Sequence, residues 1–552
     1  MRSTTVPIAL TAVLLASGCG ATSGEETEQA AGVATSVPEA RLTLVADEDP
    51  VASAVSTSRA LFDSSDVVVV AREGDEDGTL LAASAATGLG VPLLLEPSGG
   101  GSADALAAEL DRLGATTVLA VGEADGVADD ADGGPEVVAV PAVPDAVAEA
   151  TGLELAAVQQ VDDGAAVAAV AALDPERPAA LLSGEAEPAT DEAEGELEQL
   201  PAVERAEPLD GTLVMTTGAP EALAGAATAR AAGARVQLTD EGTDPRGSAE
   251  LVQLLAEQQP EAVVALGAGF AAEDGLEWKL DTAATGEQLP GGGQLLFPGH
   301  FLVALYGTPG TGALGVLGEQ DLPASIERAR AHAAPYEPLV QDAAVVPAFE
   351  IIATVASASA GPDGDYSTEI PVEELRPWVE AAGEAGLYVI LDLQPGRTDF
   401  VTQAELYRPL LELPHVGLAL DPEWRLGPNE RHLVQIGSVS IDEVNRVVNW
   451  LADLTRANQL PQKLLVLHQF RVDMIPERER LDTSRDELAI MVHVDGQGSQ
   501  PAKQDTWRVL RQTEPDEVAW GWKNFYDEDV PMLTPEETIA QVHPRPQLVT
   551  YQ

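Results

Sequence analysis

Four carboxylates in the second half of the chain stand at or just beyond the ends of short apolar runs, where β-strands would finish. They are Asp392, Asp421, Glu423 and Asp495. Neighbouring carboxylates raise one another's pKa, so one stays protonated as an acid while another remains ionised as a base or nucleophile. Hydrolysis of a glycosidic bond requires this division of roles. We therefore predict that these four residues are catalytic, with Asp421 and Glu423 as the preferred pair.

The spacing of Asp421 and Glu423 would let both side chains face one pocket. Pro422 follows Asp421 and favours an extended backbone before it, and alternate residues of an extended segment share a face. The alternative is structural, because an aspartate at a strand end often caps the next helix or loop. A single Asp-x-Glu is a weak signal, so the prediction depends on the recurrence of polar residues at five consecutive strand ends.

Polar and aromatic side chains accompany the carboxylates at the same strand ends. Side chains that donate and accept hydrogen bonds suit sugar hydroxyls, and indole rings offer flat apolar faces to sugar rings. We predict substrate-binding roles for His468, Gln469, His493, Trp424, Trp522 and Lys523. The alternative for the two tryptophans is ordinary packing in the core or at the mouth of a barrel.

Residues 294–552 contain the elements that would position these side chains. Eight apolar runs alternate with helical patterns, which is typical of a (β/α)8 or TIM barrel without its final helix. The runs are 301–306, 348–355, 387–392, 416–421, 463–468, 488–493, 518–522 and 547–551. Active sites of such barrels lie at the carboxyl ends of the strands. The candidate residues would therefore line one rim.

Two segments of this half carry a resemblance to a known class of enzymes. Residues 391–396 read Leu-Asp-Leu-Gln-Pro-Gly, and residues 419–424 read Ala-Leu-Asp-Pro-Glu-Trp. Both look like strand ends of the broad class of barrel glycoside hydrolases. The resemblance implies catalytic carboxylates at these ends and does not identify a particular family.

Residues 41–275 are built from a different set of amino acids. All tryptophans, tyrosines and histidines of the chain lie from Trp278 onward. A strand–helix–strand–helix–strand pattern occurs at 66–122 and again at 211–267, with a more degenerate unit at 136–182 and an acidic linker at 185–210. Continuous apolar strands that alternate with helices predict α/β units with parallel sheets, covered on both faces.

This half resembles the cell wall-binding repeat 2 family over about residues 42–270. The resemblance rests on Val67 to Val70, the Ala-rich helix that follows, the run Gly90 to Leu95, and the closing run Val118 to Gly122. Family members attach surface proteins to anionic cell-wall polymers. Here Asp77-Gly78-Thr79-Leu80 replaces the family's Asp-Ala-Leu signature, and the region is acidic, so the fold can carry over without the ligand. The alternative is a doubly wound domain without affinity for the cell wall.

The N-terminus predicts export and a lipid anchor. Arg2 precedes an apolar core that is too short to span a bilayer, and Leu15-Ala16-Ser17-Gly18-Cys19 resembles a bacterial lipobox, with Ala16 where leucine is usual. We expect residues 1–18 to be a signal peptide, Cys19 to carry the lipid, and residues 19–40 to be a flexible tether. The protein would then lie on the outer face of the cell membrane. The alternative is an ordinary secretory signal that is cut near Gly18.

Composition and missing motifs exclude several classes of function. The net charge of −61 makes binding to nucleic acid and anionic lipid unfavourable. The only cysteine is Cys19, so a cysteine nucleophile is excluded. No G-x-G-x-x-G follows a strand and no G-x-S-x-G occurs at a strand-to-helix turn. We expect no cofactor and no metal, because no His-x-His or His-Glu-x-x-His is present.

Three functional hypotheses remain. The first is a surface enzyme, similar to glycoside hydrolases, that acts on an envelope or environmental glycan. The second is a metal-dependent hydrolase, in which two histidines and several aspartates on adjacent strands hold zinc or manganese. The third is a non-catalytic surface protein that binds the cell wall and retains the barrel as a scaffold.

Overall fold

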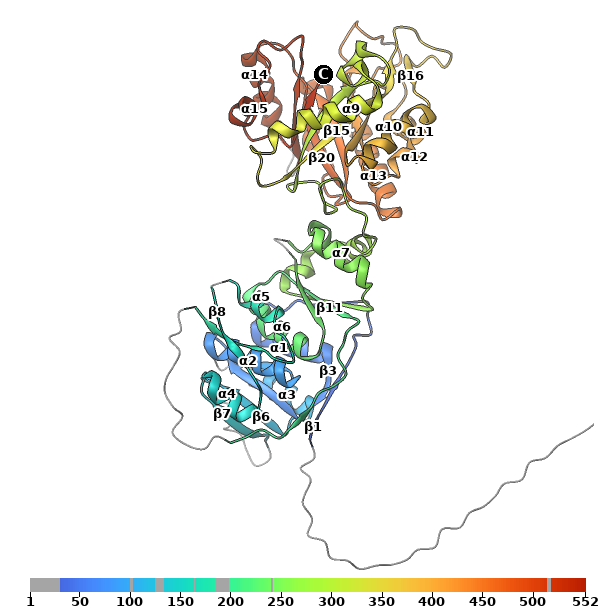
Figure 1. The fold of residues 1–552 in the computed structure, drawn as a ribbon. Helices are drawn as coiled ribbons and strands as arrows, with labels where there is room; N and C mark the ends of the chain where they lie inside the picture. Colours follow the sequence, from blue (N-terminus) through green and yellow to red (C-terminus); the bar gives the residue numbers. More distant parts are fainter. Residues whose placement is uncertain are drawn as a thin grey trace, which may run out of the picture.

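A computed structural model describes residues 30–99, 103–124, 134–162, 164–184, 198–239, 242–513 and 518–552. Figure 1 shows two bodies, an N-terminal α/β region and a C-terminal barrel. The predicted signal peptide (1–18), the lipidation site Cys19 and the first part of the tether lie outside the described residues. Among the described helices, none has the length and apolar character needed to cross a membrane.

The C-terminal region is a closed barrel of eight parallel strands, which confirms the predicted fold class. In chain order the strands are β14 (His300–Gly307), β15 (Ala344–Ala356), β17 (Tyr388–Leu393), β18 (Val416–Leu420), β19 (Lys463–Gln469), β20 (Leu488–Val494), β21 (Ala519–Asn524) and β22 (Leu548–Tyr551). Strand β14 pairs with both β15 and β22 and so closes the ring. The short strand β16 (Ser367–Glu369) pairs antiparallel with β15 outside the closed ring.

Helices cover the outside of the barrel because the outward-facing half of each strand is apolar. They are α9 (Leu322–Ala333), α10 (Val372–Glu384), α11 (Phe400–Leu406), α12 (Arg408–Leu411), α13 (Ile441–Ala457), α14 (Gln500–Leu510) and α15 (Pro535–Gln541). In α13 the buried side chains recur at helical spacing, and the hydroxyl of Ser440 caps its first turn. Between β19 and β20 the chain forms two 3-10 turns, Val472–Met474 and Arg478–Arg480, where an α-helix was expected.

Two parallel sheets with the same strand order form most of the N-terminal region. The first has the order β5 (Leu93–Glu96), β4 (Val67–Arg72), β6 (Thr117–Val121) and β7 (Glu136–Val140). The second has the order β12 (Arg235–Leu238), β11 (Thr212–Thr216), β13 (Ala262–Leu266) and β2 (Leu42–Val45). In each, the repeated unit supplies three strands, and a strand from elsewhere in the chain adds the fourth. The expected repeat of parallel α/β units is therefore present.

Small side chains let the helices of this region approach closely. The helices are α1 (Pro50–Leu61), α2 (Glu76–Leu89), α3 (Ala103–Leu113), α4 (Pro144–Thr151), α5 (Ala166–Ala171), α6 (Leu223–Ala231), α7 (Ala249–Gln258) and α8 (Leu276–Ala283). A Cβ atom on Gly225 of α6 would lie 2.7 Å from the hydroxyl of Thr57 in α1. The alanine-rich composition therefore serves close helix packing.

Three parts of the N-terminal half differ from the sequence prediction. Strand β1 (Ala31–Thr35) lies within the expected tether and pairs with β3 (Phe62–Ser65) and β10 (Val203–Glu204). The expected third unit is divided, because β7 completes the first sheet. Strands β8 (Ala156–Val161) and β9 (Ala179–Ser183) pair only with each other among the described strands.

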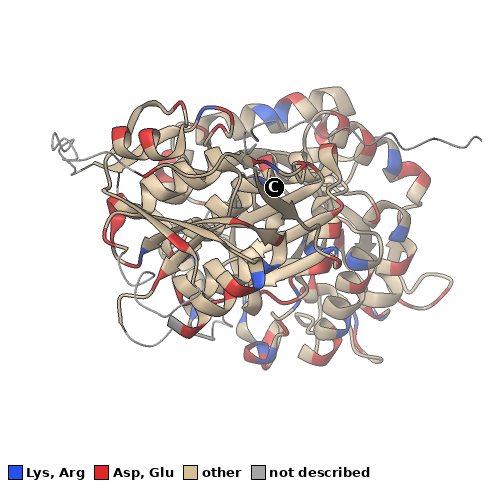
Figure 2. Ribbon diagram, turned by 90° about the horizontal axis from the view of Figure 1, so that it is seen from below, with Lys and Arg blue, Asp and Glu red and all other residues tan. Residues whose placement is uncertain are grey.

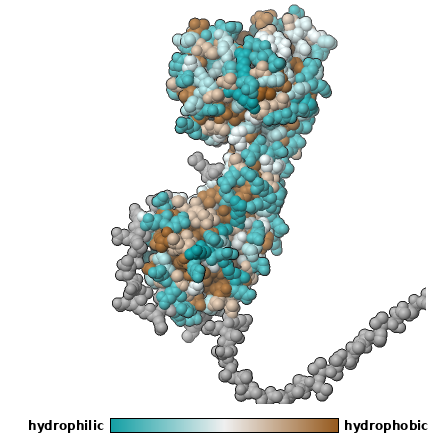
Figure 3. Space-filling model, in the orientation of Figure 1, coloured by the Kyte–Doolittle hydropathy of each residue, from teal (hydrophilic) through white to brown (hydrophobic). Residues whose placement is uncertain are grey.

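The two bodies meet at the amino ends of the barrel strands. Lys279 of α8 is 2 % exposed, and its Nζ lies 2.5 Å from Oδ2 of Asp486, which precedes β20. The ring of Trp278 lies between two guanidinium groups, those of Arg246 at 4.6 Å and Arg456 at 4.8 Å. Figure 3 shows this junction as a narrower neck. The carboxyl ends of the strands, at the opposite end of the barrel, are therefore left free.

Acidic side chains dominate the surface of the protein. Figure 2 shows Asp and Glu spread over the outer helices, with fewer Lys and Arg among them. This distribution gives the negative net charge to the surface as a whole.

Lys279→Met should weaken the junction between the two bodies. Lys279 forms ion pairs with Glu273 and Asp486 and lies 3.7 Å from Asp244. Lys279 is buried while its carboxylate partners are 16–50 % exposed, so solvent screens part of the loss and we expect the free energy of unfolding to fall by about 2 kcal/mol. Urea unfolding followed by circular dichroism measures this. The matched control is Arg508→Met, which breaks the exposed pair with Asp505 and should cost less than about 1 kcal/mol; equal losses would contradict the structural role of Lys279.

Candidate active site

The side chains that point into the barrel change from apolar to ionisable along the strands. The lower interior is an apolar cluster that includes Ala304, Ala348, Ile390, Val466 and Met491. Side chains two residues further along a strand share the same face. These next positions carry Tyr306, Glu350, Asp392, His468 and His493. The carboxyl end of the barrel interior is therefore a layer of buried ionisable groups.

A cavity of about 520 Å³ opens above this layer. Asp421, Glu423, Asp495 and Lys523 line it, and Trp424 forms part of its wall. The remaining wall is largely apolar and includes Ile352, Ile436, Phe470 and Phe525. A pocket with apolar walls and a few convergent polar groups is the usual form of a small-molecule or glycan site.

A chain of charged side chains crosses the floor of this cavity. His468 lies between two carboxylates, with Nε2 at 2.6 Å from Oε1 of Glu350 and Nδ1 at 3.2 Å from Oδ2 of Asp495. The Nζ of Lys523 lies 3.6 Å from the same Asp495 oxygen and 3.7 Å from the ring centroid of Tyr306. Negative and positive groups alternate along this chain, which offsets the cost of burying them.

The charges in this chain fix one another's protonation. Burial lowers the pKa of His468, but the charge of Glu350 and the hydrogen bond to Asp495 outweigh burial and raise this pKa well above its usual value. Burial raises the pKa of Glu350, yet His468 outweighs it and brings this pKa to about 2. In the same way, Lys523 and His468 hold the pKa of Asp495 well below its usual value against the effect of burial. At neutral pH these groups are ionised.

The other three carboxylates shift in the opposite direction because each is buried beside like charges. Burial and the neighbouring Glu350 raise the pKa of Asp392 to about 6, against the opposing charge of His468. Burial and the charge of Asp495 raise the pKa of Glu423 to about 7. Burial and the charge of Glu423 raise the pKa of Asp421 well above its usual value. The site thus holds ionised and protonated carboxyl groups side by side.

Local structure explains how Asp421 and Glu423 reach the same cavity. Residues Pro422–Trp424 form a short 3-10 helix, not the extended segment that the proline suggested. Both carboxylates line the cavity despite this difference. Asp392 lies fully buried, and its Oδ2 accepts a hydrogen bond of 2.8 Å from the hydroxyl of Tyr306. The four expected carboxylates therefore converge on one site.

Four of the six expected substrate contacts do not line the cavity: His468 and His493 are 0 % exposed beneath it, and Trp522 and Gln469 are held elsewhere. Trp522 is 1 % exposed and packs outside the barrel wall against Trp507, with ring centroids 5.7 Å apart. It alternates with Lys523, which faces inward, because successive strand residues point to opposite faces. The amide of Gln469 donates to the carbonyl oxygens of Arg471 and Val472, so it stabilises its own loop. Neither residue lines the cavity. Trp424 does, in contact with the imidazole of His432.

The sequence analysis missed Glu350 and Tyr306. Glu350 lies in the middle of the apolar strand β15, and Tyr306 is the penultimate residue of β14. A charged residue inside a strand that is otherwise apolar was the available signal for Glu350. Tyr306 ends the run 301–306 and Glu350 lies within the run 348–355, and neither was among the polar groups predicted at the strand ends.

Comparison with known proteins finds little. No family model matches the chain, and no curated protein matches it. The solved structures that are similar to it include two cell wall proteins of Clostridium difficile. Cwp8 has 14% identity and a TM-score of 0.30, with 45% of this chain and 53% of Cwp8 covered. Cwp6 has 13% identity and a TM-score of 0.31, with 65% of this chain and 63% of Cwp6 covered. The chain thus spans less than two thirds of either protein, and similarity this low supports no argument about function.

Asp495→Asn should lower the pKa of Glu423 from about 7 toward its ordinary value of 4.5. Asp495 contributes the largest charge effect on Glu423, while Lys523, His468 and Asp392 also act on it. The carboxyl signal of Glu423 in 13C NMR, assigned by its loss in Glu423→Gln, measures the titration. An unchanged pKa would contradict the coupling between the two carboxylates.

Trp522→Ala and Trp424→Ala should affect different properties. Removing the fully buried Trp522 ring should lower the free energy of unfolding by about 3–5 kcal/mol. Trp424 is half-buried in the cavity wall, so its loss should cost little stability and should weaken binding of a glycan. Urea unfolding and titration with oligosaccharides separate the two effects. A loss of binding that is equal in both variants would refute this assignment.

Proposed function

We propose that the barrel is a glycosidase-like enzyme in which Glu423 is the proton donor and Asp495 is the ionised partner. The observation that carries this proposal is the pairing of the two carboxylates in one cavity. Glu423 is half-buried, and its raised pKa of about 7 lets it keep its proton near neutral pH. Asp495 has a positive partner in Lys523, 3.6 Å away. This pair differs from the one that the sequence favoured, because the pKa values of Asp421 and Glu423 are both raised, whereas that of Asp495 is lowered.

The two carboxyl groups would act on opposite parts of the breaking bond. Glu423 would donate its proton to the glycosidic oxygen as the bond from that oxygen to the anomeric carbon breaks. Asp495 would stabilise the positive charge that develops at the anomeric carbon. The oxygen of a water molecule then bonds to the anomeric carbon. One proton of the water returns to the carboxylate of Glu423, and the other stays on the new hydroxyl group. Trp424 and Phe470, in the cavity wall, offer flat apolar faces for a sugar ring.

The proposal places this enzyme on the outside of a bacterial cell. The lipobox-like segment that ends at Cys19 supports a lipid anchor, and the first half resembles cell wall-binding repeats in sequence. The N-terminal region attaches at the amino ends of the strands, so it leaves the cavity open at the other end. The expected substrate is therefore an envelope or environmental glycan.

A second candidate, the metal-dependent hydrolase, is favoured by one observation. Glu350, His468 and His493 come together at the cavity floor, and each could offer one ligand atom to a metal ion. In that reaction a metal would activate water or polarise the bond. The two candidates share a cavity and differ in their need for a metal.

Glu423→Gln should reduce glycan hydrolysis about 10²- to 10⁴-fold, the usual contribution of a general acid. The loss should be much smaller for aryl glycosides with nitrophenolate leaving groups, because these depart without a proton. Steady-state kinetics on both substrate types measures the difference.

The matched control for this experiment is Glu536→Gln, an exposed carboxylate in α15, which should leave both rates unchanged. Equal losses of Glu423→Gln on both substrate types would overturn the role of Glu423 as proton donor. A wild-type protein that binds glycans without cleaving them would overturn the enzyme and favour the scaffold hypothesis.

A further inference from the structure

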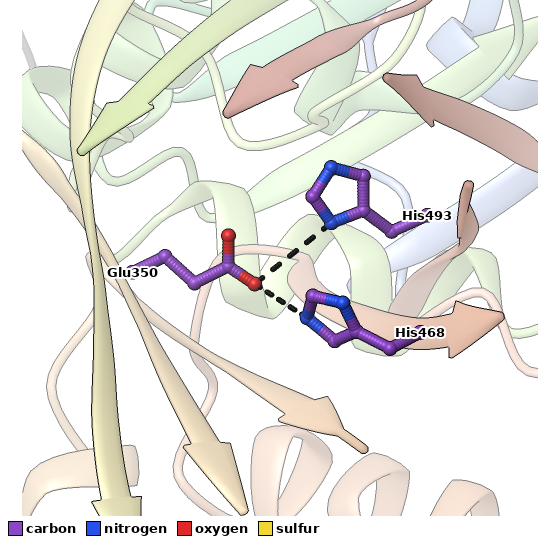
Figure 4. A group of neighbouring side chains, drawn as sticks. All are labelled: Glu350, His468 and His493. Atoms are coloured by element: carbon purple, nitrogen blue, oxygen red, sulfur yellow. Dashed lines mark hydrogen bonds and ion pairs between the residues drawn. The ribbon is translucent and has the colours of Figure 1, made fainter. Parts of the chain in front are cut away.

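Three side chains from separate strands meet at the centre of the barrel beneath the cavity. Glu350 extends from β15 toward two imidazoles, His468 on β19 and His493 on β20 (Figure 4). One carboxylate oxygen, Oε1 of Glu350, lies 2.6 Å from Nε2 of His468 and 3.9 Å from Nδ1 of His493. The two histidines are direct partners in the register of adjacent strands. All three side chains are fully buried.

His493 is the unexplained member of this group. Neither of its ring nitrogens has a hydrogen-bond partner among the described residues, although the side chain is 0 % exposed. A buried polar group without a hydrogen-bond partner destabilises the folded state. An apolar side chain at this position would avoid that cost. We therefore expect a bound group to contact one of the ring nitrogens of His493.

The strand beside His493 is shaped to admit its ring. Gly521 of β21 is opposite His493 in the strand register. A Cβ atom on Gly521 would lie 2.5 Å from Cδ2 of His493. Glycine at this position keeps the imidazole at the barrel centre, next to Glu350. This geometry argues for a built site.

The charges around the three side chains favour a cation. Glu350, Asp392, Asp421 and Asp495 surround the site with carboxyl groups, and one oxygen on each of the three aspartates lacks a hydrogen-bond partner among the described residues. Lys523 is the only lysine of the described residues within 4 Å of any of these carboxylates. Acidic groups thus outnumber basic ones at the barrel centre. A divalent cation would favour the ionised forms of the carboxyl groups that otherwise keep a proton here.

We propose that Glu350, His468 and His493 bind one divalent transition-metal ion, of which Zn²⁺ is the reference case. Two imidazole nitrogens and one carboxylate oxygen form a ligand set that zinc commonly takes, with further positions left for water or substrate. The ligand atoms lie within 4.8 Å of one another, and small side-chain rotations would bring each to about 2.0–2.2 Å from the metal. The ion would replace the proton between Glu350 and His468, which is released to solvent. This site deepens the second candidate function, the metal-dependent hydrolase, and does not depend on the glycosidase activity.

Metal binding to the full chain tests the proposal without any activity assay. Protein stripped with a chelator is titrated with Zn²⁺ in a calorimeter, and its metal content is then measured by elemental analysis. We expect one equivalent of Zn²⁺ per chain, with release of a proton. His493→Ala and Glu350→Gln should each weaken binding about 100-fold or more, because the loss of a direct ligand should exceed the effect of losing an outer-shell partner.

Two controls make the outcome decisive. His543→Ala, which removes an exposed imidazole far from β19 and β20 in the sequence, should bind Zn²⁺ like the wild type. If a buried variant fails to fold, as judged by circular dichroism, the Co²⁺ form of the wild type decides. Intense visible absorption bands of the Co²⁺ protein, which are typical of a site of low coordination number, support the proposal. Weak bands, which are typical of Co²⁺ bound by six oxygen atoms, overturn it. Absence of stoichiometric binding, or binding that survives His493→Ala in a folded protein, also overturns it.

Discussion

The burial of ionisable side chains inside the closed barrel is the constraint on which the rest of this structure depends. Taking a charge out of water costs several kcal/mol, and only partners of opposite charge or retained protons offset that cost. Here both occur, since Lys523 and His468 accompany Asp495 and Glu350, while Asp392 retains a proton to higher pH. A barrel that served only as a scaffold would be more stable with apolar residues in this layer. Perturbed pKa values of this kind are characteristic of functional sites, which supports the catalytic role that we propose.

The fold could be predicted from the sequence because apolar runs and helical patterns alternate regularly along the chain. Each apolar run of the second half became a barrel strand, since parallel strands are buried on both sides and read as continuous hydrophobic stretches. The repeated units of the first half likewise became parallel sheets. The segment of β7 was expected within a third unit, but its place in the first sheet was not. Strand β2 was not foreseen, because its neighbour β13 is distant in the sequence and such pairs leave no local pattern. The 3-10 turns between β19 and β20 were missed for a different reason, since one connection can depart from the barrel's regular alternation.

The site was only partly accessible from the sequence. Residues that follow a strand, such as Asp421 and Asp495, stand out as polar groups after apolar runs. The role of a strand residue depends on the face of the strand to which its side chain points. Lys523 points into the cavity, whereas its neighbour Trp522 packs outside the barrel wall. Glu350 was hidden because its hydrogen-bond partner His468 lies 118 positions away in the sequence. The expectation of no metal rested on short motifs, whereas the histidines meet through the register of two strands.

The most direct test of the central claim, that this layer is a catalytic site, is hydrolysis in isotopically labelled water. The full chain is incubated with purified bacterial cell-wall glycans in water enriched in 18O, and the products are analysed by mass spectrometry. The account predicts shorter glycans with one 18O atom at each new reducing end, and no such products from Asp495→Asn. Glycans that bind to the protein and are recovered uncleaved and unlabelled, with metal-free and Zn²⁺-loaded protein alike, would contradict it.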